Sequence, residues 1–499
     1  MKRLSFLGLA TGVFLIFLIP FCSLGDEVTG SNQPEADKNP YQLVRIHPQP
    51  SPVPALRYRL DPEMRNQESG NALPVYYRSF APDWQAIDKQ REWSKKFTEW
   101  KNLPLHELPK EIQSLRAMKY LREIDRAANR SYMDWEMVLP IRREGASLVI
   151  PDVQAFSGFI RLLSLRCRAE LMDKDYPAAV ATIRTMITLG RHCDQGPSII
   201  QSLVGIAASD EACFRLQEAF CQSGFPNLYW ALMAIPDVPI HMRNSIDGEK
   251  IMVDSALPGI REMVYGRQRF ALSKEELLVM QSKLETLVNL VDRSGRMKKD
   301  NCWFFPSFPQ DKLVALAKKA CQMLVEFGIP EKQLVGFPDL QLVFMAEVLM
   351  FDRKVDEDVR WLNIPYSFSK RALLVQSEKK QNKKKDSDSD LDLGFLGDLV
   401  SSGYVNSIQV KAGHHRRFAA LRVIEAIRLY AAEKGKWPES LSEIDSVYVP
   451  PDPITGNAFA FRKEKNAIWL ASIPLPFEEK RPEVWTWKLE LVPFQTEGN

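Results

Sequence analysis

The densest set of potential metal ligands in the sequence is an alternating run of aspartates. Four of them lie from Asp386 to Asp392, directly after five lysines in the stretch EKKQNKKKDSDSDLDLGFLG. A calcium loop of the EF-hand type needs glycine at its sixth position and glutamate at its twelfth. Counted from Asp386 these positions are Leu391 and Gly397, and a count from Asp388 fails as well. We therefore interpret the run as a solvated linker, with weak calcium association at extracellular concentrations as the alternative.

The histidines do not show the spacing that a metal or catalytic site needs. Consecutive helical residues point about 100° apart, so neither the stretch RHCD at 191–194 nor the pair His414 and His415 can close on one ion. The stretch HELPKE lacks the second histidine of a zinc-protease helix, and Pro109 would break that helix. The sequence also lacks a phosphate loop and the patterns GxGxxG, GxSxG and CxxC.

These patterns assign no reaction to the chain. We identify no catalytic residue, no cofactor-binding residue and no metal ligand, and we expect no cofactor. The predicted function is that of a non-catalytic interaction or scaffold protein with protein partners. The alternative is a hydrolase whose carboxylates converge in a cleft between helices. One deep pocket with pKa-shifted carboxylates would favour the hydrolase, whereas a long groove without them would favour binding.

An aromatic pair between two prolines is the clearest candidate for a binding surface. The stretch GFPNLYWALMAIP runs from Gly224 to Pro236, and Pro226 suits the first turn of a helix. Such a helix would carry one apolar stripe made of Leu228, Tyr229, Leu232 and Ile235, with Trp230 at its edge. Because aromatic stripes at helical spacing usually belong to a core, we predict packing, with binding as the alternative.

The length and charge of the chain limit its possible cores and partners. A chain of 499 residues with 45% apolar residues can bury more than one core. Its 66 lysines and arginines nearly balance 63 aspartates and glutamates, which leaves a net charge of +3. This charge is far from the concentrated basic surface of a nucleic-acid-binding protein, so we exclude nucleic acid as a partner.

The first residues have the layout of a secretory signal. Lys2 and Arg3 precede an apolar run from Leu4 to Phe21, and the small residues Ser23 and Gly25 follow it. We expect cleavage before Asp26 and an exported protein, periplasmic or secreted. The alternative is an uncleaved membrane anchor, since the apolar run approaches the roughly 20 residues that span a bilayer. No later stretch is long and apolar enough to span a membrane.

Six cysteines remain after the signal, and export permits disulfides. Cys213 and Cys221 lie eight residues apart in a helical pattern, which separates them by about 12 Å along the axis. We therefore do not expect them to pair with each other. Most of the six are interpreted as small buried core residues.

Periodicity divides the chain into five segments and predicts a mainly α fold with a small C-terminal α+β part. The segments are a signal peptide (1–25), a proline-rich extended strap (26–82), a stack of antiparallel helices (83–376), a charged linker (377–398) and an α+β module (399–499). Within the stack, residues 162–192 resemble a tetratricopeptide-type helix pair. Ser273 and Glu276 form a capping box ahead of an apolar stripe.

The last hundred residues predict a helix followed by a small sheet. Phe418 to Tyr430 place apolar residues on one ridge of a helix that Gly435 ends. The stretch VWTWKLEL alternates apolar and polar residues, with Trp485 and Trp487 on the apolar side, as in a half-buried strand.

Four ordered stretches resemble a large paralogous family of uncharacterised exported bacterial proteins. They are RYRLDPEMRNQESGNALPVYYRS, GPSIIQSLVGIAASDEA, PNLYWAL and LVEFGIPEKQLVGFPDLQLVFMAEVLM. The resemblance covers nearly the whole chain after the signal and implies export. It implies no activity, because that family has none assigned.

The C-terminal part is similar to the globular part of type II secretion pseudopilins. The residues that carry the likeness are Gly435, Trp437, Pro438, Leu441, Asp452, Pro453 and Gly456. The likeness implies a pseudopilin-like fold and a link to envelope or secretion assemblies. A pseudopilin has this unit directly behind its N-terminal helix, whereas here it follows some 400 residues, and the calcium-binding tail is missing after Ile473. We therefore extend the fold to this chain, but not filament assembly or calcium binding.

Overall fold

Helices dominate the computed structural model and a small sheet accompanies them, which confirms the predicted fold class. The structure describes residues 41–79, 84–148, 152–237, 239–291, 303–305, 307–373, 375, 393–475, 478 and 485–493. The predicted signal peptide and the aspartate run lie outside the described residues. Within the described residues, no helix combines the length and apolar character that crossing a membrane requires.

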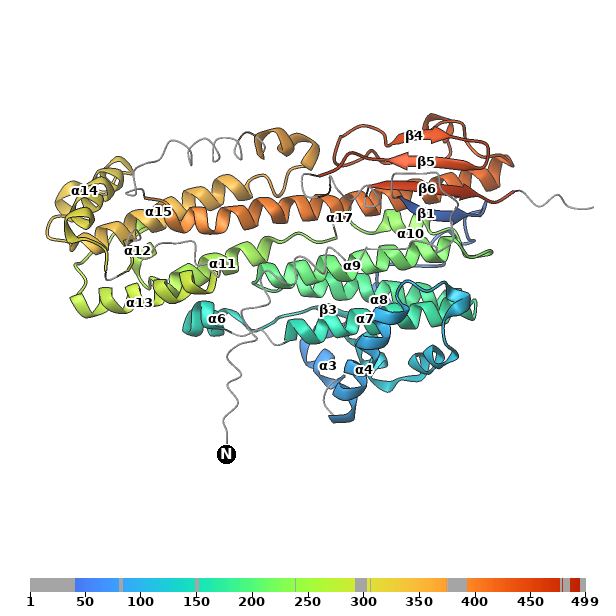
Figure 1. Cartoon of the computed structure of the whole chain (residues 1–499), viewed down its shortest axis with the longest axis horizontal. Coiled ribbons are helices and arrows are strands. Elements are labelled where there is room, and N and C mark those ends of the chain that lie inside the picture. Colours follow the sequence, from blue (N-terminus) through green and yellow to red (C-terminus); the bar gives the residue numbers. More distant parts are fainter. Residues whose placement is uncertain are drawn as a thin grey trace, which may run out of the picture.

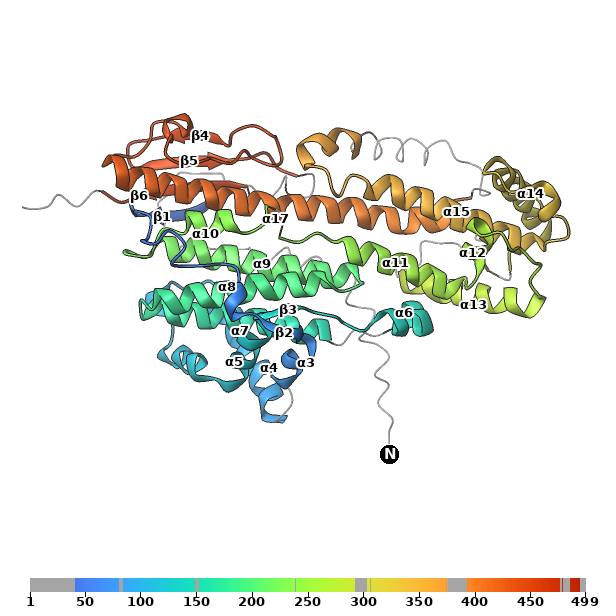
Figure 2. The same ribbon diagram turned by 180° about the vertical axis from the view of Figure 1, so that it is seen from behind.

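The long helices form layers along an elongated molecule. In chain order they are α4 (Trp84–Trp100), α7 (Asp152–Met172), α8 (Tyr176–Asp194), α9 (Ile199–Phe220), α11 (Arg243–Ala256), α13 (Lys274–Val291), α14 (Gln310–Glu326), α15 (Asp339–Val359) and α17 (Phe395–Lys434). α15 and α17 lie along one side, α9 and α11 lie next to them, and α7 and α8 lie beyond α9 (Figure 1). The view from behind shows the same order (Figure 2).

Shorter elements complete the fold. They are α3 (Leu73–Arg78), α5 (Lys119–Ala128), α6 (Val138–Glu144), α10 (Tyr229–Ala234) and α12 (Ile260–Tyr265), with a parallel pair β2 (Glu68–Asn71) and β3 (Arg130–Tyr132). α12 and α14 lie at one end of the long axis, and the main sheet lies at the other (Figure 1).

The main sheet pairs a strand from near the start of the described chain with strands from near its end. Its strands are β1 (Gln42–Ile46), β6 (Thr486–Leu491), β5 (Ala467–Ala471) and β4 (Ala460–Lys463), in that spatial order. β1 comes from the predicted strap and runs parallel to β6, whereas the other pairs are antiparallel. Burial alternates along β6, where Trp487, Leu489 and Leu491 are buried, as the sequence pattern predicted.

The predicted helical hairpin is formed by α7 and α8. Asp175 accepts a hydrogen bond from the backbone N–H of Ala178 (3.3 Å) and caps α8. α8 then packs closely on α9 through two glycines. A Cβ on Gly190 would lie 2.6 Å from the carbonyl oxygen of Gly205, so the backbones touch where no side chain intervenes.

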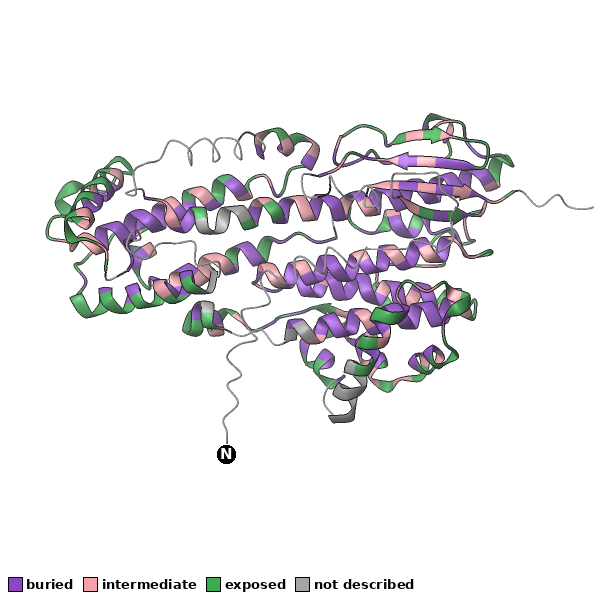
Figure 3. Ribbon diagram, in the orientation of Figure 1, coloured by how far each residue is buried: buried purple, intermediate pink, exposed green. Residues whose placement is uncertain are grey.

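Two further local predictions are confirmed. Ser273 and Glu276 exchange the two hydrogen bonds of a capping box (2.8 and 3.2 Å) ahead of α13. α17 ends at Lys434, and Gly435 follows with φ +65°. α17 begins at Phe395, however, well before the ridge that the sequence indicated. Residues 418–431 of this helix are all buried, which Figure 3 shows as an unbroken buried stretch beside the sheet.

The aromatic pair packs as predicted, but its helix starts later. α10 begins at Tyr229, three residues after Pro226, because the side chain of Asn227 accepts the backbone N–H of Tyr229 (2.9 Å) and sets the first turn there. The side chains of the stripe, Leu228, Tyr229, Leu232 and Ile235, are at most 3% exposed. Trp230 lies at the edge and is 42% exposed.

Two apolar cores hold the molecule together, and α17 contributes to both. One core runs from Val44 in β1 through α7, α8 and α9 to Leu491 in β6. The other contains α12, α13, α14, α15 and the first half of α17. The C-terminal sheet and the helical stack therefore share one core, and residues Phe418 to Ala431 of α17 fill its centre. Cys213 and Cys221 are both free thiols.

Ile46 offers a test of the contribution of β1. It is fully buried between the sheet and the helices, so Ile46→Ala removes apolar contacts that cannot be replaced by water. We expect a loss of roughly 2 to 5 kcal/mol in the free energy of unfolding, measured by urea denaturation with circular dichroism. Leu43→Ala is the matched control, because Leu43 lies on the same strand and is 43% exposed. Similar losses in both variants would contradict the role of β1 in the core.

Candidate functional site

Titratable side chains gather where α17 crosses α9. Lys411, His414 and His415 lie at helical spacing on one stripe of α17, and Arg417 lies beside them. Asp210 meets them from α9. We call these five residues the polar junction. It lies between the two apolar cores, because Ala412 belongs to one core and Phe418 to the other.

Asp210 and His414 form the arrangement that orients a general base. His414 Nδ1 donates to Asp210 Oδ1 over 2.7 Å, and Arg417 Nη1 donates to Asp210 Oδ2 over 2.7 Å. Burial alone would raise the pKa of Asp210, but the charge of Arg417 and the hydrogen bonds from His414 and Arg417 outweigh it, so the pKa is lowered. The carboxylate therefore stays ionised and fixes the imidazole ring.

The geometry of His414 does not give this pair access to a substrate. Its Nε2, the atom that would move a proton, has no hydrogen-bond partner among the described residues. The side chain is 0% exposed, and the ring packs edge-on against Phe418 (centroids 5.1 Å apart). A general base must reach the proton that it abstracts. We therefore interpret the pair as a contact that locks α17 onto α9.

The other two members of the polar junction are also enclosed. Burial lowers the pKa of His415 to about 4, so its ring is neutral at pH 7. Burial lowers the pKa of Lys411 to about 8, against the attraction of Asp194. Lys411 Nζ donates to the carbonyl oxygen of Leu362 (2.9 Å) and approaches that of His241 (3.5 Å). Lys411 thus ties α17 to the segment after α15 and to the start of α11.

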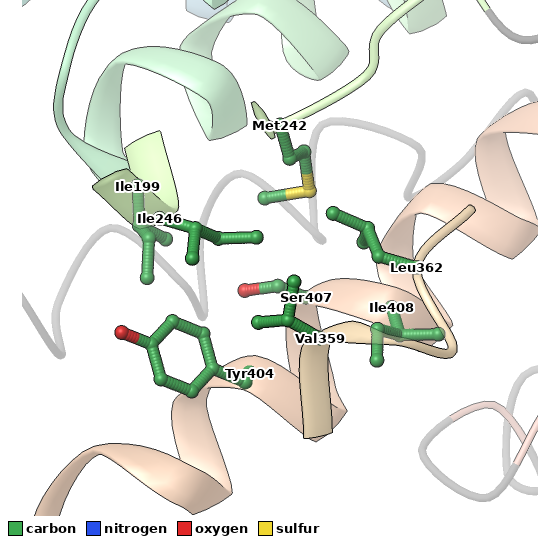
Figure 4. A pocket seen from close by; sticks show the side chains of 8 residues that line it. All are labelled: Ile199, Met242, Ile246, Val359, Leu362, Tyr404, Ser407 and Ile408. Carbon is green, nitrogen blue, oxygen red and sulfur yellow. The ribbon is translucent and has the colours of Figure 1, made fainter. Parts of the chain in front are cut away.

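A small apolar pocket lies one turn from Lys411. Figure 4 shows its lining, made of Ile199, Met242, Ile246, Val359, Leu362, Tyr404, Ser407 and Ile408. The hydroxyl of Ser407 donates to the carbonyl oxygen of Gly403 (2.8 Å), which leaves aliphatic groups and the phenol of Tyr404 facing the space. Charged side chains do not line it, so it lacks the groups that acid–base or nucleophilic chemistry requires.

Carboxylates with a raised pKa are dispersed over the molecule. Burial raises the pKa of Glu170, Glu249 and Glu347 to about 7, and it also raises those of Asp194, Asp254 and Glu425. Among the described residues, no two of these six carboxylates share a hydrogen-bond partner. They do not form the convergent pair that the hydrolase alternative needs.

Two of these carboxylates accept hydrogen bonds from backbone N–H groups instead. Glu347 Oε1 accepts the N–H of Gly394 (2.8 Å) and its Oε2 accepts that of Leu396 (3.2 Å) at the start of α17. Asp194 accepts the N–H groups of His241 (2.6 Å) and Met242 (3.0 Å) just before α11. Both carboxylates thereby satisfy donors that helix starts leave unpaired.

The motifs that the sequence singled out also take part in packing. In the stretch 191–194, His192 Nδ1 accepts from the hydroxyl of buried Tyr76 (3.0 Å), and Cys193 is a buried free thiol. Burial lowers the pKa of His192 to about 4, so the ring is neutral and its Nε2–H faces the carbonyl oxygen of Arg130 (3.2 Å). His106 lies on the surface with its side chain 81% exposed. Within the described residues, no cluster of three or more histidine, cysteine, aspartate or glutamate side chains could hold a metal.

The comparisons with known proteins identify no family for this chain. The chain matches no family model, no curated protein and no solved structure. The likeness to exported bacterial proteins and the likeness to pseudopilins both stay predictions. Sequence reasoning missed Asp210 and Glu347, because their partners lie 204 and 47 residues away and leave no local pattern.

Replacing Asp210 by asparagine should destabilise the protein, because Arg417 then lacks its counter-charge and His414 loses its charged hydrogen-bond acceptor. We expect a loss of about 3 kcal/mol in the free energy of unfolding at pH 7, the low end for a buried ion pair. The pKa of Asp210 is lower in the folded chain, so its stabilisation is complete above the ordinary value of 3.8 and is lost as the pH falls through the lowered value. The difference between the two proteins should therefore shrink in strong acid.

Asp237→Asn is the matched control for Asp210→Asn. Asp237 pairs with Arg422 over 2.5 Å, but its side chain is 78% exposed, so we expect a loss of about 0 to 1 kcal/mol. Urea denaturation across a pH series measures both variants. Equal losses, or a gap that does not change with pH, would contradict the locking role of Asp210.

Proposed function

We propose that the protein is an exported, non-catalytic interaction or scaffold protein of the cell envelope that binds a protein partner through one end of its helical stack. The enclosed polar junction and the dispersed carboxylates support this proposal over catalysis. Its main support is a group of exposed aromatic and aliphatic side chains at the end opposite the sheet.

We call this group the distal apolar surface. It consists of Tyr265, Phe270, Phe327 and Val335, which are 51%, 57%, 45% and 75% exposed. Tyr265 and Phe327 meet edge to face, with ring centroids 5.7 Å apart. These residues come from the end of α12, the end of α14 and the loops that follow both helices.

A hydrogen bond between two side chains holds the two loops next to each other. Arg269 Nη1 donates to Gln333 Oε1 (2.7 Å), and Arg269 Nη2 donates to the carbonyl oxygen of Val264 (3.1 Å). Gln341 Nε2 donates to the carbonyl oxygen of Phe270 (2.8 Å), which holds this aromatic residue in place from α15. The distal apolar surface is therefore built on a supported backbone, so little ordering is needed when a partner binds.

The chemistry of the distal apolar surface fits a protein partner. Exposed charges of both signs surround it, among them Arg267, Glu326, Glu331 and Lys332. A mixed rim does not attract a polyanion, whereas aromatic anchors inside a polar rim are typical of protein interfaces. The partner should offer an apolar pocket to the rings of Phe270 and Phe327.

A crosslinking experiment in living cells tests this surface. A photo-crosslinking amino acid at Val335 should give an adduct of one defined mass, because this residue is highly exposed next to the aromatic anchors. In the Phe270→Ala/Phe327→Ala background the yield should fall about tenfold or more, since each buried aromatic anchor contributes 1 to 2 kcal/mol or more to binding. The measurement is the adduct yield on immunoblots.

The control places the same crosslinker at Val53, which is 89% exposed in the segment that follows β1. Adducts from Val53 should not depend on Phe270 and Phe327. An adduct at Val335 that survives the double substitution, or no adduct at Val335 at all, would contradict the proposed interface. Unchanged melting curves of the double variant exclude loss of folding as the cause.

Export is tested separately at the N-terminus. The protein isolated from its cells should begin at Asp26, because small residues at positions 23 and 25 follow the apolar run. Gly25→Leu should retain the first residues, since a large side chain does not fit the cleavage pattern. Mass spectrometry of the intact chain measures both. Wild-type protein that keeps Met1 in the membrane fraction would instead show an anchor.

A further inference from the structure

One row of side chains crosses the outer face of the main sheet. Leu43 of β1 lies opposite Lys488 of β6, which lies opposite Trp469 of β5, which in turn lies opposite Arg462 of β4. We call these four residues the cross-sheet row. Lys488 and Arg462 are two strand spacings apart, or about 10 Å, with the indole ring between them.

This face of the sheet is turned away from the helices. Successive side chains of a strand point to opposite faces. Trp487 and Leu489, the neighbours of Lys488, are fully buried in the core, so Lys488 points outward. α17 lies behind the sheet in Figure 1 and in front of it in the reverse view, so this helix covers one face. On the other face, Arg462 is exposed and Trp469 and Lys488 are half-buried among the described residues.

Lys488 is held between two aromatic rings. Its Nζ lies 5.0 Å from the ring centroids of both Tyr41 and Trp469, and these rings meet edge to face at 4.9 Å. Arg462 lies 5.5 Å from the ring centroid of Trp469. Among the described residues, no carboxylate oxygen lies within 4.0 Å of Lys488 Nζ, whose hydrogen bond goes to the Tyr41 hydroxyl (3.4 Å). The ammonium group is therefore positioned by the rings, and the described part of the chain gives it no counter-charge.

The described part of the chain begins at this same face. Tyr41 is the first described residue, and the apolar run Leu4 to Leu24 precedes it in the sequence. The intervening residues 25–40 can span at most roughly 55 Å when fully extended. Any membrane that holds the apolar run, during export or as an anchor, is therefore within reach of the cross-sheet row.

We propose that the outer face of the main sheet docks on a membrane surface that contains anionic phospholipids. Tyrosine and tryptophan favour the boundary between headgroups and acyl chains, and Leu43, 43% exposed, adds an aliphatic contact at the end of the row. Lys488 and Arg462 face the lipid phosphates, where each basic residue contributes about 1 kcal/mol. The proposal does not use the distal apolar surface, and the two can fail independently.

The strength of this docking is limited by neighbouring carboxylates. Arg462 pairs with Glu464 (2.9 Å), and Arg45 pairs with Glu490 (2.7 Å) on the same face. Among the described residues of this face, Lys488 thus carries the basic charge that no carboxylate pairs with. Binding in solution is consequently weak and depends on salt, and a tether to the membrane strengthens it by raising the effective concentration.

Vesicle binding tests the proposal with the chain from Asp26 onward, which keeps every described residue but lacks the apolar run that would insert by itself. It should sediment with vesicles of phosphatidylcholine and phosphatidylglycerol and much less with phosphatidylcholine alone. Lys488→Glu/Arg462→Glu should weaken this binding by at least about thirtyfold, the equivalent of two basic contacts. Lys488→Gln alone should weaken it about fivefold and serves if the double variant does not fold.

The matched control is Lys318→Glu/Lys332→Glu, which makes the same change in net charge at the opposite end of the molecule. It should bind vesicles like the unaltered protein. A similar loss in both double variants would show attraction by net charge alone and would overturn the proposal. So would vesicle binding that the sheet variants leave unchanged, or the absence of binding.

Bromine-labelled lipids add a test of contact. They should quench part of the tryptophan fluorescence, and this part should disappear in Trp469→Phe, which keeps the charges. A Trp469→Phe variant that is quenched as strongly as the unaltered protein would place the contact elsewhere.

A soluble acidic polymer is the competing ligand. If polyglutamate binds through Lys488 and Arg462 while vesicles do not, this face takes an acidic chain and the membrane proposal fails.

Discussion

The burial of three guanidinium groups on α17 is the constraint on which much of the fold depends. Arg416, Arg422 and Arg428 are six residues apart, so they point in three directions around the helix, and each is at most 1% exposed. A buried guanidinium needs acceptors on all sides. The carbonyl oxygens that supply them come from separate segments, namely Ile473, Leu232 and Ile235, and His47 and Phe225. The strap, α10 and the sheet are thereby fixed to one helix.

The same helix explains why residues that could do chemistry are enclosed. α17 belongs to one apolar core up to Ala412 and to the other from Phe418 onward. Where the cores meet, apolar packing is interrupted, and polar side chains fill the gap only if they satisfy one another. The stretch that contains His414 and His415 lies at this place. Its histidines and charges are therefore a structural consequence of joining two cores.

Local patterns were sufficient for the elements whose cause is local. The capping box at Ser273, the end of α17 at Gly435 and the alternation in β6 each depend on residues a few positions apart. The pairing of β1 with β6 depends on segments more than 400 residues apart, and the contact of Asp210 with His414 bridges 204 residues. Neither contact can be predicted from spacing or periodicity, since any exposed strand or any carboxylate could have been the partner.

The continuity of α17 also links the two surfaces for which we propose binding. This helix has 40 residues and is about 60 Å long, and its neighbours α9 and α15 pack along it on either side of the polar junction. A helix that is buried on all sides from Phe418 to Ala431 does not bend there without breaking its arginine contacts. The sheet packs on the C-terminal half of α17, whereas α12 and α14, which carry the distal apolar surface, pack on α15, and α15 packs on the N-terminal half of α17. These packed helices hold the two surfaces at opposite ends of the molecule (Figure 1). A partner at one end would accordingly stand at a fixed distance from a membrane at the other, which is the geometry that a scaffold requires.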